Sequence, residues 1–215
     1  KQEAEFRFYV LYDKISLGYM LREAYKKCRS KNGAPGVDNI TFEQIEGRGI
    51  SLLLEEIQQE LKSRTYKPSA VKRVYIEKAN GKMRPLGIPT IKDRVVQMAC
   101  KMVIEPVFEA DFEDTSYGFR PKRSAHDAVT KIKEILKEGN LEIFDADLSA
   151  YFDTIPHSKL LKLIGMRISD KNVIHLIKLW LKPPISEDGK ISGGKGNGLG
   201  TPQGGVISPL LANIY

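Results

Sequence analysis

The feature that most constrains the fold is a change in the spacing of apolar residues at Lys67. Before it, apolar side chains such as Leu17 and Leu21 recur at helical spacing, and a further helix fits residues 51–64. After it, the pattern alternates and is rich in β-branched residues. The Asn80-Gly81 pair in this second pattern is a strong signal for the turn of a β-hairpin. Helices on both sides of a hairpin predict a mixed fold.

The rest of the chain favours an α+β arrangement. Helices are predicted for residues 90–107, for the apolar stripe that follows Ser124, and for the two runs that meet near Ser169-Asp170. The stretch LEIFDADL, residues 141–148, predicts a strand, and a last helix is predicted from Val206. Because strands and helices do not alternate as in a doubly wound sheet, we predict the α+β class.

Composition narrows the class of partner. The 215 residues carry a formal net charge of +7, which favours a polyanion such as nucleic acid, although a basic but ordinary enzyme fits equally well. No apolar run is long enough to cross a bilayer, so no membrane partner is expected. Cys28 and Cys100 form neither a disulfide framework nor a metal spacing, and we expect a reducing, cytoplasmic setting.

Three carboxylates lie within FDADLSAYFDTIPH, at Asp145, Asp147 and Asp153. Because side chains alternate along a strand, Asp145 and Asp147 are expected on one face, with Phe144 and Ala146 on the other, toward a core. Two carboxylates on one face repel each other unless a cation is present, and Mg²⁺ prefers oxygen ligands. A strand end with one solvated and one helix-capping aspartate fits the same residues, so both interpretations stay open at this point.

Two further segments suit phosphate chemistry. The GTPQGG stretch precedes a predicted helix, where glycines permit close approach of a ligand and free N–H groups favour anions. The predicted hairpin carries Lys78 and Arg84, a pair able to hold a triphosphate. A glycine-rich turn and a solvated edge strand are the ordinary alternatives for these two segments.

Taken together, the segments resemble the group II intron reverse transcriptases, also called intron maturases. The matching blocks are NGAPGVDNITFEQIE, RPLGIPTIKDRVVQ, YGFRPKRSAHDAV, ADLSAYFDTIPH and GTPQGGVISPLLANIY, in that order. The resemblance implies a right-hand polymerase fold with helix-rich fingers, a β-hairpin and the first part of an antiparallel palm sheet. It divides the chain into a largely helical, RNA-contacting extension at 1–66, fingers at 67–140 and a partial palm at 141–215.

The resemblance also implies RNA-directed DNA polymerisation with two Mg²⁺ ions. Asp147 is matched to catalysis and to metal binding, the Leu148 carbonyl is matched to one metal, and Asp145 and Asp153 are given no metal role. The residues matched to nucleotide binding are Lys78, Arg84, Phe152 and Gln203. The two cations would hold the triphosphate, the phenylalanine would lie under the sugar and exclude a 2′-hydroxyl, and the glutamine would line the nucleotide and template pocket.

The implied partners are group II intron RNA, an RNA template with a DNA primer, and deoxynucleoside triphosphates, with roles in splicing and mobility. The cations predicted to contact RNA phosphates are Lys26, Lys27, Arg29 and Lys31. The family's third palm motif and thumb lie downstream of Tyr215, so the 215 residues alone are not expected to polymerise. The alternatives are an RNA-binding splicing cofactor without polymerase activity, and a CRISPR-associated or retron-type reverse transcriptase. The oligomeric state is left open.

Overall fold

The N-terminal part of the chain is helical, as its apolar spacing predicts. The computed structural model describes residues 5–77, 81, 83–193 and 198–215. Its first helices are α1 (Tyr12–Ile15), α2 (Gly18–Arg29), α3 (Phe42–Arg48) and α4 (Ile50–Lys62). Helix α3 begins at a capping box, in which the Thr41 side chain accepts from the Gln44 N–H and the Gln44 side chain accepts from the Thr41 N–H. The local signals for helix formation are therefore confirmed here.

The predicted hairpin is confirmed and belongs to a four-stranded sheet. Strands β1 (Val71–Glu77) and β2 (Met83–Ile88) pair antiparallel, while the turn residues 78–80 lie outside the described residues. Strands β3 (Pro184–Glu187) and β4 (Lys190–Gly193) complete the order β2-β1-β3-β4, with β1 and β3 parallel. The sequence did not predict β3 and β4, which are short and are joined by Asp188 and Gly189.

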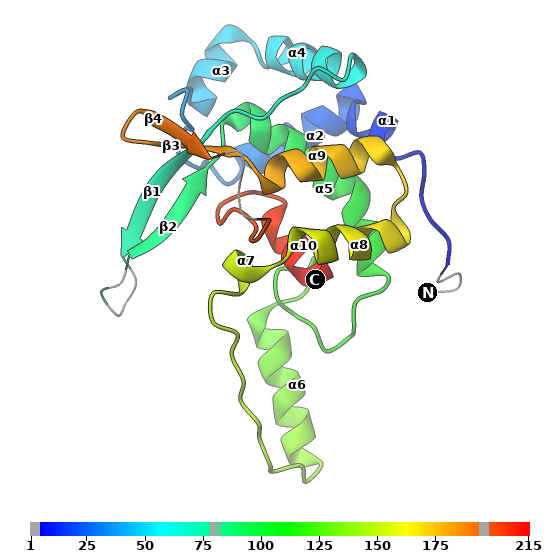
Figure 1. Ribbon diagram of the computed structural model, residues 1–215. Helices are drawn as coiled ribbons and strands as arrows, with labels where there is room; N and C mark the ends of the chain where they lie inside the picture. Colours follow the sequence, from blue (N-terminus) through cyan, green and yellow to red (C-terminus); the bar gives the residue numbers. More distant parts are fainter. Residues whose placement is uncertain (1–4, 78–80, 82, 194–197) are drawn as a thin grey trace.

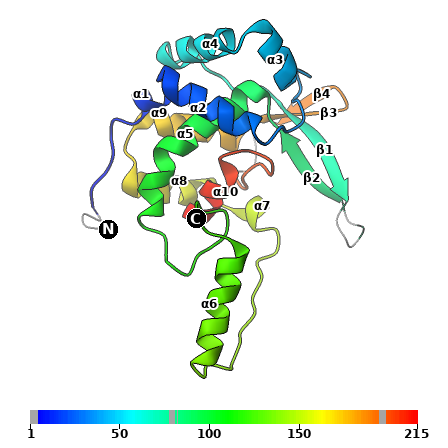
Figure 2. The same ribbon diagram turned by 180° about the vertical axis from the view of Figure 1, so that it is seen from behind.

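Helix α5 (Ile91–Glu109) is the centre of the helical body. It packs against α1, α2, α4 and α10, and Figure 2 shows it running between the N-terminal helices and the C-terminal ones. The helices that complete the body are α8 (His157–Arg167), α9 (Lys171–Leu181) and α10 (Ser208–Ile214). One apolar core joins residues from all three predicted domains, and the division at 66 and 140 stays a prediction.

A buried aspartate ties the N-terminal segment to this body. One carboxylate oxygen of Asp170 accepts the backbone N–H groups of Leu11 and Tyr12, each at 2.9 Å. The other oxygen accepts the N–H groups of Asn172 and Val173 at the start of α9. This one side chain therefore both caps helix α9 and satisfies two backbone donors of a distant segment. Asp170 is only 6% exposed, so water does not compete for these contacts.

Two expectations fail in the arm of the molecule that extends below the body in Figure 1. This arm consists of α6 (Ala125–Lys137) and the following residues 138–149. Helix α6 starts at Ser124 as predicted, but none of its residues is buried, and Ile132 in its apolar stripe is 54% exposed. Residues 141–148 form no strand, and Phe144, expected to face a core, is 93% exposed.

The physical reason for the missing strand is the lack of a pairing partner. A strand is stable only when its backbone N–H and C=O groups meet those of a neighbour. Among the described residues, no strand pairs with 141–148, and the segment that runs beside it in Figure 1 is helix α6, whose backbone groups bond within the helix. The alternation of Asp145 and Asp147 therefore indicates a segment suited to a sheet, but this segment is not paired in the part of the chain that the structure describes.

Candidate active site

Five of the residues matched from the sequence line one open cavity of about 810 Å³. They come from strand β2, from the end of the arm, from the short helix α7 (Tyr151–Thr154) and from the loop before α10. These residues are Arg84, Asp147, Leu148, Phe152 and Gln203. Lys78 lies outside the described residues. Because the end of the arm continues directly into α7, the fold gathers three distant segments around a space of the size that small-molecule sites have.

Asp147 reaches this cavity through a sharp turn. Residues 141–150 are exposed throughout, and Ala150 then adopts a left-handed conformation with φ of 51°. The Asp153 N–H donates to the Ala150 carbonyl at 2.9 Å and closes the turn into α7. A left-handed alanine costs of order 1 kcal/mol, so the surrounding structure must hold it. The turn brings Asp147 and Phe152 to the wall of the same cavity.

Phe152 is half-buried and belongs to a small group of aromatic rings. Its ring stands edge-on to Phe119 at a centroid distance of 6.3 Å and to Tyr151 at 6.1 Å. Such edge-to-face pairs restrain a ring beyond what simple burial does. Phe119 also lines the cavity and is 66% exposed. Sequence reasoning missed Phe119 as a site residue, although it lies in the YGFRP block and has a left-handed φ of 55°.

The glycines of the GTPQGG loop serve a close contact between two parts of the chain. The Gly87 N–H of strand β2 donates to the Gln203 carbonyl at 2.8 Å. At Gly204, with φ of 106°, a Cβ would collide with the Gly87 carbonyl oxygen, so a larger residue does not fit. The predicted close approach therefore exists, and its partner is the hairpin backbone. This contact holds the loop against β2, and Gln203 and Arg84 both line the cavity.

A buried glutamine supports the same loop from below. Gln97 of α5 is 5% exposed, and its Oε1 accepts the backbone N–H groups of Val206 at 2.9 Å and Ile207 at 3.5 Å. The Ser208 hydroxyl donates to the Pro202 carbonyl at 2.8 Å. These contacts hold the turn into α10, and no sequence pattern pointed to Gln97 as a supporting residue.

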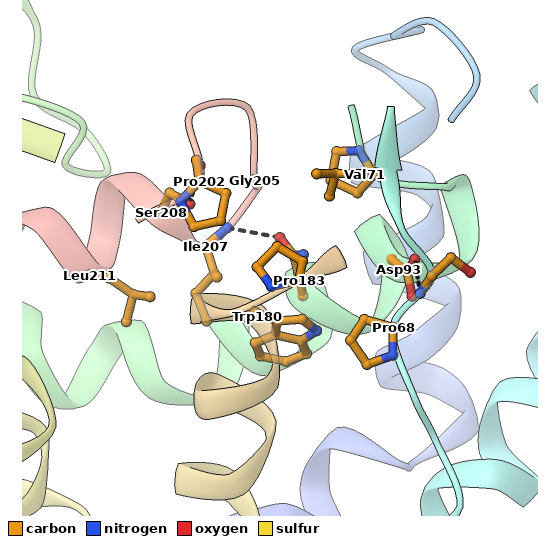
Figure 3. Close-up of a pocket in the computed structure, with 13 residues that line it drawn as sticks. Pro68, Val71, Asp93, Trp180, Pro183, Pro202, Gly205, Ile207, Ser208 and Leu211 are labelled. Carbon is orange, nitrogen blue, oxygen red and sulfur yellow. Dashed lines mark hydrogen bonds between the residues drawn. The ribbon is translucent and has the colours of Figure 1, made fainter. Parts of the chain in front are cut away.

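Figure 3 shows the seam under this loop. Pro202, Gly205 and Ile207 face Trp180 and Pro183 across a cavity of only about 10 Å³. A space of that size is at the lower limit for a single water molecule. The loop therefore rests directly on the end of α9, and its position depends on close packing.

Asp147 has surroundings that suit a divalent ion with substrate phosphates. Mg²⁺ commonly takes one or two carboxylates and completes its shell with phosphate oxygens and water. Asp147 is exposed at the wall of the cavity that Arg84 also lines. No three histidine, cysteine, aspartate or glutamate side chains in the described part of the chain gather into a metal site. An ion here would depend on Asp147 and on the substrate.

The four N-terminal cations differ in what they contact. Lys26 forms an ion pair with Glu23 at 2.7 Å within α2. Arg29 pairs with Glu46 at 2.8 Å, and its guanidinium lies over the Phe42 ring at 5.5 Å. The remaining two, Lys27 and Lys31, are exposed and have no ion pair among the described residues. Arg29 therefore joins α2 to α3, while the two lysines point to solvent.

Helices in the described ranges include none that is both long and apolar enough to cross a membrane.

Comparison with known proteins assigns the family. A family profile described as "Reverse transcriptase (RNA-dependent DNA polymerase)" matches residues 76–215. The chain is 44% identical over 204 residues to the "Group II intron-encoded protein LtrA" of Lactococcus lactis subsp. cremoris, covering 92% of this chain and 33% of that protein. It is 43% identical over 200 residues to "Protein YkfC" of Escherichia coli, covering 90% of this chain and 51% of that protein.

These relatives are longer than the chain, which spans about half of one and a third of the other. Among solved structures, the "Partial Cas6-RT-Cas1--Cas2 complex" contains a chain that matches with a TM-score of 0.63 at 22% identity, over 95% of this chain and 33% of that one. At that identity the match supports the polymerase-like fold alone. The chain belongs to the reverse transcriptase family, and its resemblance to the group II intron-encoded members is confirmed.

Proposed function

We propose that this chain supplies the fingers and the start of the palm of an RNA-directed DNA polymerase encoded by a group II intron. The observation that carries the proposal is the convergence of Arg84, Asp147, Phe152 and Gln203 on one cavity of about 810 Å³. Strand β2, residues 147–152 and the loop before α10 have no local reason to meet. Their chemistry, one cation, one carboxylate, one ring and one amide, suits a deoxynucleoside triphosphate.

Each residue has a role that follows from its chemistry. Arg84 is exposed on β2 and offers a fork of N–H donors to the triphosphate oxygens. Phe152 is held edge-on by Phe119 and Tyr151, so its ring presents a firm wall to the sugar and leaves no room for a 2′-hydroxyl. Asp147 and the Leu148 carbonyl would hold Mg²⁺, which when bound activates the primer hydroxyl and offsets charge on the leaving pyrophosphate.

The test is primer extension by the full-length protein. Asp147→Asn keeps the size of the side chain and removes its charge, so extension should fall by at least about a hundredfold while folding and RNA binding stay unchanged. Asp145→Asn is the matched control, because Asp145 lies two residues away in the same exposed segment but does not line the cavity. Near wild-type extension by Asp147→Asn would remove the basis of the proposal.

A second function, binding of structured intron RNA in support of splicing and mobility, is favoured by Lys27 and Lys31. Both are exposed near the end of α2 and have no ion pair among the described residues, so their ammonium groups can reach phosphates without breaking a contact. Arg29 and Lys26 would have to leave their glutamate partners first. Within the proposed RNA surface, Lys27 and Lys31 are thus the principal contacts. A cytoplasmic location stays a prediction.

RNA binding at this surface is tested by its salt dependence. Removal of one lysine that touches a phosphate should reduce the slope of log affinity against log salt by roughly 0.7 to 0.9. Lys27→Gln with Lys31→Gln should therefore weaken binding of intron RNA and flatten the slope. Lys159→Gln with Lys162→Gln on α8 is the matched control, since these lysines are also exposed. An equal slope for all three proteins would exclude this surface as an RNA anchor.

A further inference from the structure

The Gln203 side chain is held by a carboxylate that the sequence left without a role. Its Nε2 donates to both oxygens of Asp153, each at 3.1 Å. The two residues belong to separate segments, Asp153 to helix α7 and Gln203 to the loop before α10. A hydrogen bond to an ionised acceptor is stronger than one between neutral groups. The contact therefore joins two segments that both line the candidate active site.

The pair also forms part of the wall between two cavities. Asp153 and Gln203 line the 810 Å³ cavity that contains Asp147. They also line a second cavity of about 230 Å³, whose other lining residues include Arg73 and Lys182. Pro85 is shared in the same way. Separation of the two side chains would open a path between the cavities, so the hydrogen bonds help to define the space in which a nucleotide can lie.

The backbone on both sides of the pair is fixed. The Thr201 N–H donates to the Phe152 carbonyl at 2.7 Å, and the Gly200 N–H donates to the Ile155 carbonyl at 2.8 Å. A Cβ at Gly200 would lie 3.0 Å from the Asp153 carbonyl oxygen, so glycine permits this approach. With the main chains held, the remaining freedom is in the two side chains, and their contact restricts it.

A carboxylate fixes which way an amide points. An ionised aspartate only accepts hydrogen bonds, so the amide nitrogen of Gln203 must face it. The Gln203 Oε1 then remains as an acceptor, and it has no hydrogen-bond partner in the described part of the chain. An asparagine in place of Asp153 could donate as well as accept, and the glutamine could then adopt either orientation.

We propose that Asp153 is a positioning residue, whose carboxylate orients Gln203 so that its Oε1 is presented to a hydrogen-bond donor of the incoming nucleotide or its template base. This inference rests on the proposed polymerase function. It assigns Asp153 to nucleotide affinity and leaves the chemical step to Asp147. A purely structural role gives a different result. An aspartate that only stabilised the short helix α7 would affect the stability of the protein and would leave the dependence of the rate on nucleotide concentration unchanged.

The test is steady-state nucleotide addition by the full-length protein on a primer-template. Asp153→Asn should raise the KM for a deoxynucleoside triphosphate roughly three- to tenfold, the range expected for one exposed hydrogen bond, with kcat within about twofold. Asp153→Glu keeps the acceptor and should recover part of the loss. In a Gln203→Ala background, Asp153→Asn should add nothing, because a double-mutant cycle cancels effects that pass through one partner. Glu142→Gln in the arm is the matched control, since Glu142 is exposed and lies outside the cavity.

The outcomes separate this inference from the function on which it rests. If the wild-type protein extends primers and Asp153→Asn has an unchanged KM, or lowers kcat equally in both Gln203 backgrounds, the positioning role is wrong while the polymerase function stands. If the wild-type protein does not extend a primer, the proposed function falls and this inference falls with it. A raised KM that disappears in the Gln203→Ala background supports the role.

Discussion

The central helix α5 and the exposed helix α6 both begin at a hydroxyl cap, but α5 is largely buried and α6 is not. The Thr90 hydroxyl caps α5 and contacts Asp93, and the Ser124 hydroxyl caps α6 and contacts Asp127. Yet Asp93 is 2% exposed and Asp127 lies on the surface. Burial raises the pKa of Asp93, whereas hydrogen bonds from Ser124 lower the pKa of Asp127. A capping pattern predicts where a helix starts and says nothing of what covers it.

The largest expected difference between the two helices comes from removal of the aspartates that contact these caps. Asp93 accepts hydrogen bonds from the Tyr66 hydroxyl, the Ser69 N–H and the Thr90 hydroxyl. Asp93→Ala should therefore leave buried donors unpaired and lower the free energy of unfolding by about 4 kcal/mol. Asp127→Ala should lower it by only a small part of that amount, because water can replace an exposed cap. Urea denaturation of the two variants measures both changes.

Equal losses in the Asp93→Ala and Asp127→Ala variants would contradict the contrast in burial.

Two isoleucines provide an independent and somewhat smaller comparison. Ile104 on α5 is fully buried, and Ile132 on α6 is 54% exposed. Ile104→Ala should destabilise the chain by about 3 kcal/mol through the cavity it leaves. Ile132→Ala should change stability by less than about 0.5 kcal/mol.

The isoleucine pair also reports on what covers the arm in solution. A cost for Ile132→Ala close to that for Ile104→Ala would mean that the apolar stripe of α6 is covered, for instance by a second copy of the chain. Measuring thermal unfolding of each variant at several protein concentrations distinguishes the two cases. A stripe covered by another copy gives a melting temperature that rises with concentration.

The same contrast explains which parts of the fold the sequence could predict. Ser124 and the Asn80-Gly81 pair act on neighbours in the chain, and the helix and the hairpin that they predict are present. Strand β3 pairs with β1 across more than a hundred residues, and such pairing has no local signal. The strand expected at 141–148 does not form for a related reason. Its pairing would also depend on a distant segment, and no strand among the described residues pairs with it.

The sequence could predict which residues belong to the candidate site, but it could not predict how they are placed and supported in space. Arg84, Asp147, Phe152 and Gln203 were named from their blocks, and they do line one cavity. The sequence did not single out Gln97, and it gave Asp153 no metal role and no supporting role, because a glutamine in a helix and an aspartate beside a phenylalanine carry no pattern of their own. Their contacts depend on where distant segments come to lie.

The smallest and most specific prediction concerns the pH dependence of stability. For Asp93, the folded pKa lies above the ordinary value of 3.8, so between these two values the folded state binds more protons than the unfolded state. The contribution of Asp93 should be greatest below 3.8 and should decline as the pH rises through its raised folded pKa. For Asp127, the folded pKa lies below 3.8, so its contribution to stability is present above that value and is lost as the pH falls through the lowered pKa.

The measurement is the free energy of unfolding at each pH between about 2.5 and 6. Subtracting the value for Asp93→Asn or Asp127→Asn from that of the wild-type chain isolates the contribution of each aspartate. The two difference curves should slope in opposite directions, and curves of the same sign would show that the two caps lie in similar surroundings after all.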